Sequence, residues 1–244
     1  MSKFPGKMEM FGAMLSLFHK TGLDVRRFPT RDQRKLMHYL NQHGVNDCFD
    51  VGANTGQFAL LLRSIGFKGN IFSFEPQTKA FQELRSSSDG AKRWNVYNIA
   101  LGNTDASVKI NISENSVSSS LLEISQLLTD VAPETKYISS EEVEVKRLDN
   151  FLEGIDFHRK FFLKIDAQGF EAKILEGAEN CFDLIYALQI ELTCVSLYKG
   201  EKLFDEMKSF IESKGFYLSG IESGFADMKT GRLLQVEAIF LRDA

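Results

Sequence analysis

The sequence has few cysteines and no long apolar run. Its three cysteines, Cys48, Cys181 and Cys194, lie far apart, and none belongs to a CxxC or Cys/His pattern typical of a metal site. We therefore expect reduced core cysteines, as in a cytoplasmic protein. No stretch of about 18 apolar residues occurs, so no transmembrane helix is expected. The N-terminus also lacks the apolar core and cleavage site of a signal peptide.

The chain also lacks the charge excess of a nucleic-acid-binding protein. Its net charge is −4 over 244 residues, which predicts no nucleic-acid partner. The charge is uneven, because the first 40 residues carry eight Lys/Arg against three Asp/Glu. Apolar residues recur there with helical period at Phe11, Met14, Leu15 and Phe18. This basic helix predicts either peripheral contact with the inner membrane surface or a cap on the domain or on a homodimer partner, and the cap is the simpler interpretation.

The sequence does contain enough hydrophobic residues, 43%, for one large core. Thr30 followed by Gln33 predicts a capping box that begins a helix, which His43 and Gly44 end. Strand patterns then alternate with helix patterns, which predicts an α/β fold with a parallel sheet covered on both faces. We expect an N-terminal helical extension, 1–44, and a main domain, 45–244. The expected strands are 48–51, 70–74, 94–99, 108–112, 143–147, 161–165, 187–192, 216–221 and 233–241, with a long loop at 113–141.

A glycine-containing loop between the first strand and the next helix carries the strongest local signal. It reads Asp50-Val51-Gly52-Ala53-Asn54-Thr55-Gly56-Gln57-Phe58, with the spacing G-x-x-x-G. The dinucleotide fingerprint G-x-G-x-x-G has a glycine where this chain has Asn54, and a pyrophosphate needs the close backbone approach that this glycine permits. The loop therefore disfavours an NAD-dependent oxidoreductase and favours a ligand without a pyrophosphate.

Two further strand ends suit a nucleoside. Glu75 follows the second strand, and an acid about 20 residues after the first glycine is placed to accept hydrogen bonds from ribose hydroxyls. Pro76 fits a strand end because it cannot donate to the ladder. Ala100 and Leu101 follow the third strand and could form the wall for an adenine base.

A charged group is expected where the strand 161–165 ends. Asp166 follows this strand, and the alternation of strand side chains predicts that Lys164 points to the same side. Glu191 ends the next strand and would lie beside Asp166 if the two strands are neighbours. These residues are candidates for a general base, a divalent-metal site or a substrate-orienting group. Alternative bases are His19, His38, His43 and His158.

These segments together resemble the FkbM-family methyltransferases, from about Asp47 to the C-terminus. The resemblance rests on the loop 50–57, on 74–76, on 100–103, on 118–121, on 163–171 and on 231–240. It implies a Rossmann-like class I methyltransferase fold, whose mostly parallel seven-stranded sheet has an antiparallel last strand. It also implies S-adenosylmethionine as methyl donor, S-adenosylhomocysteine as product, and hydroxyl acceptors on sugars, glycans or secondary metabolites.

The sequence therefore predicts an S-adenosylmethionine-dependent O-methyltransferase. A non-catalytic adenosyl-cofactor-binding module that serves a partner enzyme is the alternative, and no metal site is assigned, although a divalent ion remains compatible. The residues 118–120 in the long loop could bind a polyhydroxyl acceptor. The expected catalytic residues are Asp166, Glu191 and Lys164. The expected acceptor-binding residues are Ser118, Ser119 and Ser120. The expected cofactor-binding residues are Asp50, Gly52, Asn54, Thr55, Gly56, Phe58, Glu75, Pro76, Ala100, Leu101 and Asp166.

Overall fold

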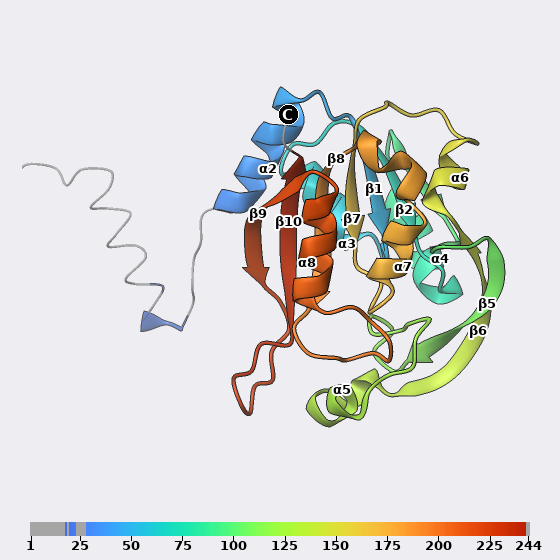
Figure 1. Cartoon of the computed structure of the whole chain (residues 1–244), viewed down its shortest axis with the longest axis vertical. Coiled ribbons are helices and arrows are strands. Elements are labelled where there is room, and N and C mark those ends of the chain that lie inside the picture. The colour runs from blue at the N-terminus through green and yellow to red at the C-terminus, as the bar shows by residue number, and fades with distance from the viewer. Residues whose placement is uncertain (1–17, 19, 23–27, 243–244) are drawn as a thin grey trace, which may run out of the picture.

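The computed structural model describes residues 18, 20–22 and 28–242 of the chain (Figure 1). The expected basic helix from Phe11 and its membrane or dimer contact lie almost entirely outside the described residues and stay predictions. The next helix, α2 (Arg31–Gln42), begins with the expected capping box, in which Thr30 and Gln33 each accept a backbone N–H of the other. None of the helices in the described residues is long and apolar enough to span a membrane.

The core of the fold is a seven-stranded sheet in the order β3-β2-β1-β7-β8-β10-β9. All neighbours are parallel except at β10, which runs antiparallel to both β8 and β9. The predicted mostly parallel sheet with an antiparallel last strand is thereby confirmed. The strands are β1 (Asp47–Val51), β2 (Asn70–Phe74), β3 (Trp94–Tyr97), β7 (Phe161–Ile165), β8 (Ile185–Thr193), β9 (Phe216–Ser223) and β10 (Gln235–Arg242).

Helices cover both faces of this sheet, because its central strands are apolar on both sides. On one face α2, α3 (Gln57–Ser64) and α4 (Thr78–Ser88) pack against alternate strand residues such as Cys48 and Phe162. On the other face the next residues along the same strands, such as Phe49 and Leu163, contact a second set of helices. These are α6 (Leu148–Leu152), α7 (Glu171–Glu176), α8 (Phe204–Ser213) and the 3-10 helix η2 (Glu179–Leu184).

A smaller three-stranded sheet, β4-β6-β5, lies beside the main one. It consists of β4 (Ala100–Leu101), β5 (Ala106–Ser113) and β6 (Tyr137–Lys146), and the segment between β5 and β6 contains α5 (Gln126–Val131) and the 3-10 helix η1 (Pro133–Thr135). Figure 1 shows β5, β6 and α5 along the lower edge of the molecule, where the parallel strands end. This arrangement sets a second wall opposite the strand ends.

Two expectations about the strands are corrected. The strand expected at 94–99 ends two residues earlier, at Tyr97, and Ala100–Leu101 form a separate strand, β4, in the second sheet. Between them the Asn98 side chain donates to the carbonyls of Glu75 and Pro76, at 2.9 Å each, where the chain turns. The loop expected to continue to residue 141 ends earlier, at Tyr137, where β6 begins. The first half of β6 is polar and mostly exposed, so it has no apolar alternation to reveal it.

Candidate active site

A cavity of about 680 Å³ lies at the carboxyl ends of β1, β2, β7 and β8, under the β5–β6 segment. This is the edge at which open α/β sheets bind ligands. One end of the cavity is lined by Gly52, Asn54, Glu75 and the β4 residues. The other end, which we call the far end, is lined by Gln189, Glu222, Gly224, Phe225, Gln235 and Glu237.

The turn after β1 requires glycine for two different reasons. Gly52 has φ +74°, and a Cβ on it would lie 1.8 Å from the carbonyl oxygen of Asp166, so the ends of β1 and β7 could not approach as they do. Gly56 has φ +94°, and its Cβ would lie 2.9 Å from the Trp94 ring. Gly52 and Asn54 line the cavity, whereas Gly56 and Thr55 are outside its lining and shape the start of α3.

Glu75 presents a buried carboxylate to the same end of the cavity. Its side chain is only 3% exposed, and its two oxygens accept the backbone N–H groups of Asn54 at 2.9 Å and Gln77 at 2.8 Å. Burial raises its pKa to about 7, although these two N–H donors act in the opposite direction. Each carboxylate oxygen still has a lone pair to accept a ligand hydroxyl.

The wall beside Glu75 is apolar. Ile99, Ala100, Leu101 and Pro76 all line the cavity there. Ala100 and Leu101 form β4 and pair with β6 rather than continuing β3, so the second sheet supplies this wall. An apolar wall next to a buried carboxylate has the character of a nucleoside site.

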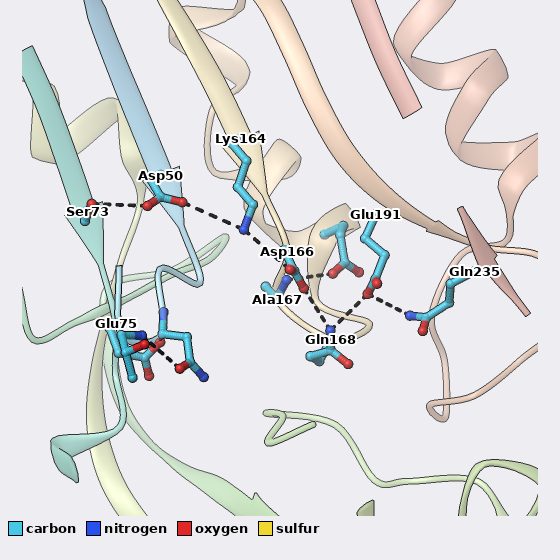
Figure 2. A network of polar contacts seen from close by, with 12 residues as sticks. Asp50, Ser73, Glu75, Lys164, Asp166, Ala167, Gln168, Glu191 and Gln235 are labelled. Atoms are coloured by element: carbon cyan, nitrogen blue, oxygen red, sulfur yellow. Dashed lines mark hydrogen bonds and ion pairs between the residues drawn. The ribbon is translucent and has the colours of Figure 1, made fainter. Parts of the chain in front are cut away.

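A row of charged groups crosses the ends of the central strands (Figure 2). The Lys164 ammonium lies 3.7 Å from Asp50 Oδ1 and 3.4 Å from Asp166 Oδ2, and Ser73 donates to Asp50 at 3.2 Å. Burial alone would lower the pKa of Lys164, but the carboxylates of Asp166 and Asp50 outweigh it and the pKa is raised. Lys164 and Asp166 line the cavity on the same side, as the alternation predicted, whereas Asp50 is fully buried beneath it.

Gln168 connects the two carboxylates at the ends of β7 and β8. Its amide donates to Asp166 Oδ1 at 2.8 Å and to Glu191 Oε2 at 2.9 Å, and Gln235 donates to the same Glu191 oxygen at 2.7 Å (Figure 2). Glu191 therefore lies beside Asp166 as expected, but it is not among the residues that line the cavity. Burial, followed by the charge of Asp166, raises the pKa of Glu191 well above its ordinary value.

The three serines expected to bind an acceptor line the cavity and are almost fully buried. Their hydroxyls make hydrogen bonds inside the protein: those of Ser119 and Ser120 hold the β5–β6 segment against the strand ends, and that of Ser118 bonds within the segment. The bonds are Asn115 Nδ2 to Ser118 Oγ at 3.1 Å, Ser119 Oγ to Gln77 Oε1 at 3.1 Å, and Ser120 Oγ to the carbonyl of Gln168 at 2.6 Å. Phe58 also lines the cavity, and the Lys164 ammonium lies 5.5 Å from the centre of its ring.

The far end contains residues that the sequence analysis did not select. Glu237 on β10 lies opposite Glu191 on β8 and Glu222 on β9, so the three side chains share one face of the sheet. Burial raises the pKa of Glu237 to about 7, although the Lys164 charge opposes it. The available signal was a polar residue within an apolar strand, the same signal that identified Lys164.

None of the histidines in the described residues lines this cavity. His38, His43 and His158 are all absent from the cavity lining, and His158 Nδ1 lies 3.0 Å from Asp47, where β1 begins. His19 is outside the described residues. Within the described parts of the chain, no three His, Cys, Asp or Glu side chains form a group that could hold a metal ion.

The residues fit S-adenosylmethionine as a cofactor. The buried Glu75 carboxylate suits a ribose, the apolar β4 wall suits adenine, and the acids around the cavity suit a cationic sulfonium. Together with the strand order and the antiparallel β10, this site defines a Rossmann-like S-adenosylmethionine-dependent methyltransferase.

Comparison with known proteins identifies the family. Residues 50–218 match the methyltransferase FkbM domain, so the chain belongs to the FkbM methyltransferases. The C-terminal segment 231–240, which also carried the resemblance, lies beyond this match. The hexuronic acid methyltransferase AglP of Haloferax volcanii is 24% identical over 164 residues, which cover 66% of this chain and 63% of that relative's length.

Solved structures show likeness at the level of the fold alone. An rRNA methylase from Streptococcus thermophilus has 9% identity and a TM-score of 0.49, with 91% of this chain and 100% of that chain covered. A precorrin-6y C5,15-methyltransferase from Geobacter metallireducens has 8% identity and a TM-score of 0.44, with 86% and 87% covered.

Proposed function

We propose that this methyltransferase is an O-methyltransferase that transfers the methyl group of S-adenosylmethionine to a hydroxyl of a sugar, a glycan or another small polyol. The main support is that one cavity has an end that suits the donor and another end that is lined by polar side chains. The hexuronic acid methyltransferase named above acts on a sugar, which supports a sugar acceptor here.

We assign the donor end to Gly52, Asn54, Glu75, Pro76, Ala100 and Leu101, with Phe58 beside them. Glu75 would accept the ribose hydroxyls, and its carboxylate is already oriented by two backbone N–H groups. Asp50, Thr55 and Gly56 act indirectly in this proposal. Asp50 holds Lys164 from below, while Thr55 and Gly56 shape the turn that leads into α3.

We assign Asp166 the role of accepting the proton of the acceptor hydroxyl. S-adenosylmethionine, when bound, supplies an already activated methyl group, so alignment of donor and acceptor contributes much of the rate. A sugar hydroxyl is a weak nucleophile, and a carboxylate that receives its proton assists the transfer. The Lys164 ammonium at 3.4 Å and the Gln168 amide at 2.8 Å keep the Asp166 carboxylate oriented.

Glu191 has a different part in this scheme. Two amides hold its carboxylate, it does not line the cavity, and burial followed by the charge of Asp166 raises its pKa well above the ordinary value. We therefore propose that Glu191 positions Gln168 and Gln235 around the acceptor rather than acting as the base. The residues 118–120 would fix the β5–β6 segment over both ligands.

Calorimetric titration with S-adenosylhomocysteine, with NAD titrated in parallel, tests the donor assignment. We expect binding of S-adenosylhomocysteine alone, weakened at least about tenfold in Glu75→Ala because the ribose loses its acceptor. Binding of NAD alone would refute the methyltransferase assignment. Formation of S-adenosylhomocysteine with a panel of hydroxyl acceptors then separates an enzyme from a non-catalytic adenosyl-binding module, which would bind the donor without turnover.

A further inference from the structure

We propose that the far end of the cavity is an acceptor subsite that selects an uncharged polyol and disfavours a uronic acid. This inference rests on the proposed function and concerns the chemical class of its acceptor. The far end is continuous with the donor end in one cavity of about 680 Å³. That volume lies in the upper half of the range of about 300–1,000 Å³ found for small-molecule sites, as a site for two ligands requires.

The charges along the cavity are almost all negative. Glu75, Glu134, Asp166, Glu222 and Glu237 line it, and Lys164 is the one basic residue in the lining among the residues that the structure describes. The Lys164 ammonium already lies between Asp50 and Asp166, and its side chain is only 7% exposed. Among the described residues that line the cavity, an acceptor carboxylate would therefore find no free cation and would face like charges.

The hydrogen-bonding groups at the far end match hydroxyl donors. Glu237 Oε1 is buried and has no hydrogen-bond partner within the described part of the chain. Glu222 receives only a long bond, 3.5 Å, from Thr30 Oγ1. The amide N–H₂ of Gln235 is used by Glu191, which leaves its carbonyl oxygen as the group available to a ligand.

Apolar surface completes the subsite. Phe225 and Gly224 line the same end of the cavity. A sugar ring has C–H faces between its equatorial hydroxyls, and an apolar wall beside hydrogen-bond acceptors suits both parts of it. An unpaired buried acceptor such as Glu237 Oε1 gains most from a ligand hydroxyl, because leaving it unpaired costs its full desolvation.

The protonation of Glu237 sets the pH at which this selection is strongest. Its pKa of about 7 results from burial, which the charge of Lys164 and a side-chain hydrogen bond with Gln189 oppose and the charges of Asp166 and Glu222 support. The Glu191 carboxyl also faces it from the neighbouring strand β8. Below pH 7 Glu237 carries a proton and repels an anion less. We therefore expect the discrimination against a uronate to increase between pH 6 and pH 8.

Binding of matched sugar pairs tests the proposal directly. Each pair consists of a methyl hexoside and the corresponding methyl hexuronoside in the gluco, galacto and manno series, titrated at pH 8 with S-adenosylhomocysteine present. We expect a neutral sugar to bind and its uronate to bind at least about tenfold more weakly. Stronger binding of the uronate, or binding of no neutral sugar, overturns the proposal.

Charge-neutralising variants identify the residues responsible. Glu222→Gln with Glu237→Gln removes both negative charges and keeps the side-chain volumes, so the ratio of the two affinities should fall about tenfold. Glu83→Gln, on the exposed side of α4 and outside the cavity, is the matched control and should leave the ratio unchanged. An unchanged ratio in the double variant overturns the proposal. Affinity for S-adenosylhomocysteine, measured alone on each protein, shows separately whether the donor assignment has failed.

Discussion

Of the two glycines that line the cavity in the described residues, Gly52 leaves less room for a Cβ than Gly224, and Gly52→Ala is therefore an informative single change. A Cβ there would lie 1.8 Å from the carbonyl oxygen of Asp166, whereas a carbon and an oxygen approach comfortably only to about 3.3 Å. The ends of β1 and β7 would have to separate by about 1.5 Å. This movement would alter the floor of the donor end and the position of Asp166 at once.

The cost of this substitution can be estimated from its parts. An alanine at φ +74° costs about 1 kcal/mol from its left-handed backbone alone. The separation would also break the bond from Asp166 N–H to the Val51 carbonyl, now 3.1 Å, and strain the bond from Gly52 N–H to the Phe74 carbonyl, now 3.0 Å. Each lost bond costs about 1 kcal/mol. We expect the free energy of unfolding to fall by about 2–3 kcal/mol, depending on whether the strained bond is also lost.

Gly90→Ala is the matched control for the backbone effect. Gly90 has φ +70°, and a Cβ on it would meet nothing within 4 Å. Chemical denaturation should show a loss of about 1 kcal/mol for Gly90→Ala, and calorimetry should show unchanged affinity for S-adenosylhomocysteine. Gly52→Ala should bind S-adenosylhomocysteine at least about tenfold more weakly. If the two variants lose the same stability and bind alike, the close approach of Gly52 to Asp166 does not shape the donor site.

Three further changes test the charged groups. Lys164→Met leaves Asp50 buried without its cation. Chemical denaturation should show that the free energy of unfolding falls by about 3 kcal/mol, and by more at pH 8 than at pH 5. Adding Asp50→Asn to this variant should recover part of that loss. Asp166→Asn should reduce turnover at least about 100-fold in single-turnover assays. Thermal stability should change little, because the Asp166 side chain is 35% exposed. Near-normal turnover would exclude Asp166 as the base. The raised pKa of Glu75, about 7 against 4.5 in the unfolded chain, means that its proton-linked stability is present below pH 4.5 and lost as the pH rises through 7. Affinity for S-adenosylhomocysteine should change oppositely, rising about tenfold from pH 6 to pH 8 as the carboxylate ionises, and Glu75→Gln should flatten both profiles.

Local sequence patterns predicted the donor end of the site well. The strands 70–74 and 161–165 have the expected bounds, because short apolar runs that are buried on both faces are distinctive. A parallel sheet brings the carboxyl ends of its strands to one edge, so Gly52, Glu75 and Asp166 could be grouped without knowledge of distances. Each of these three residues does line one cavity.

The second sheet could not be predicted in the same way. Where β6 pairs with β5, Ser139 and Ser140 are exposed and Glu141 is partly buried, so the hydrophobic alternation of a half-buried strand is missing. The turn at Asn98 depends on bonds to Glu75 and Pro76, more than 20 residues earlier in the chain. Such long-range side-chain bonds have no local sequence signature.

The far end of the cavity depends on the register of β10, which the sequence does not reveal. Glu191 ends a strand and so was predicted to be a candidate base, but the side chains that neighbouring segments bring to it determine whether its carboxylate can reach a ligand. Here β10 runs antiparallel to β8 and places Glu237 directly across from Glu191. Gln235, two residues before Glu237 on the same strand, donates a hydrogen bond to the Glu191 carboxylate. Glu237 lines the cavity, whereas Glu191 on the same face of the sheet is held by the amides of Gln168 and Gln235 and does not line it. A one-residue shift of β10 would turn Glu237 to the opposite face of the sheet, so the presence of Glu237 in the cavity depends on strand pairing, which no local motif reveals.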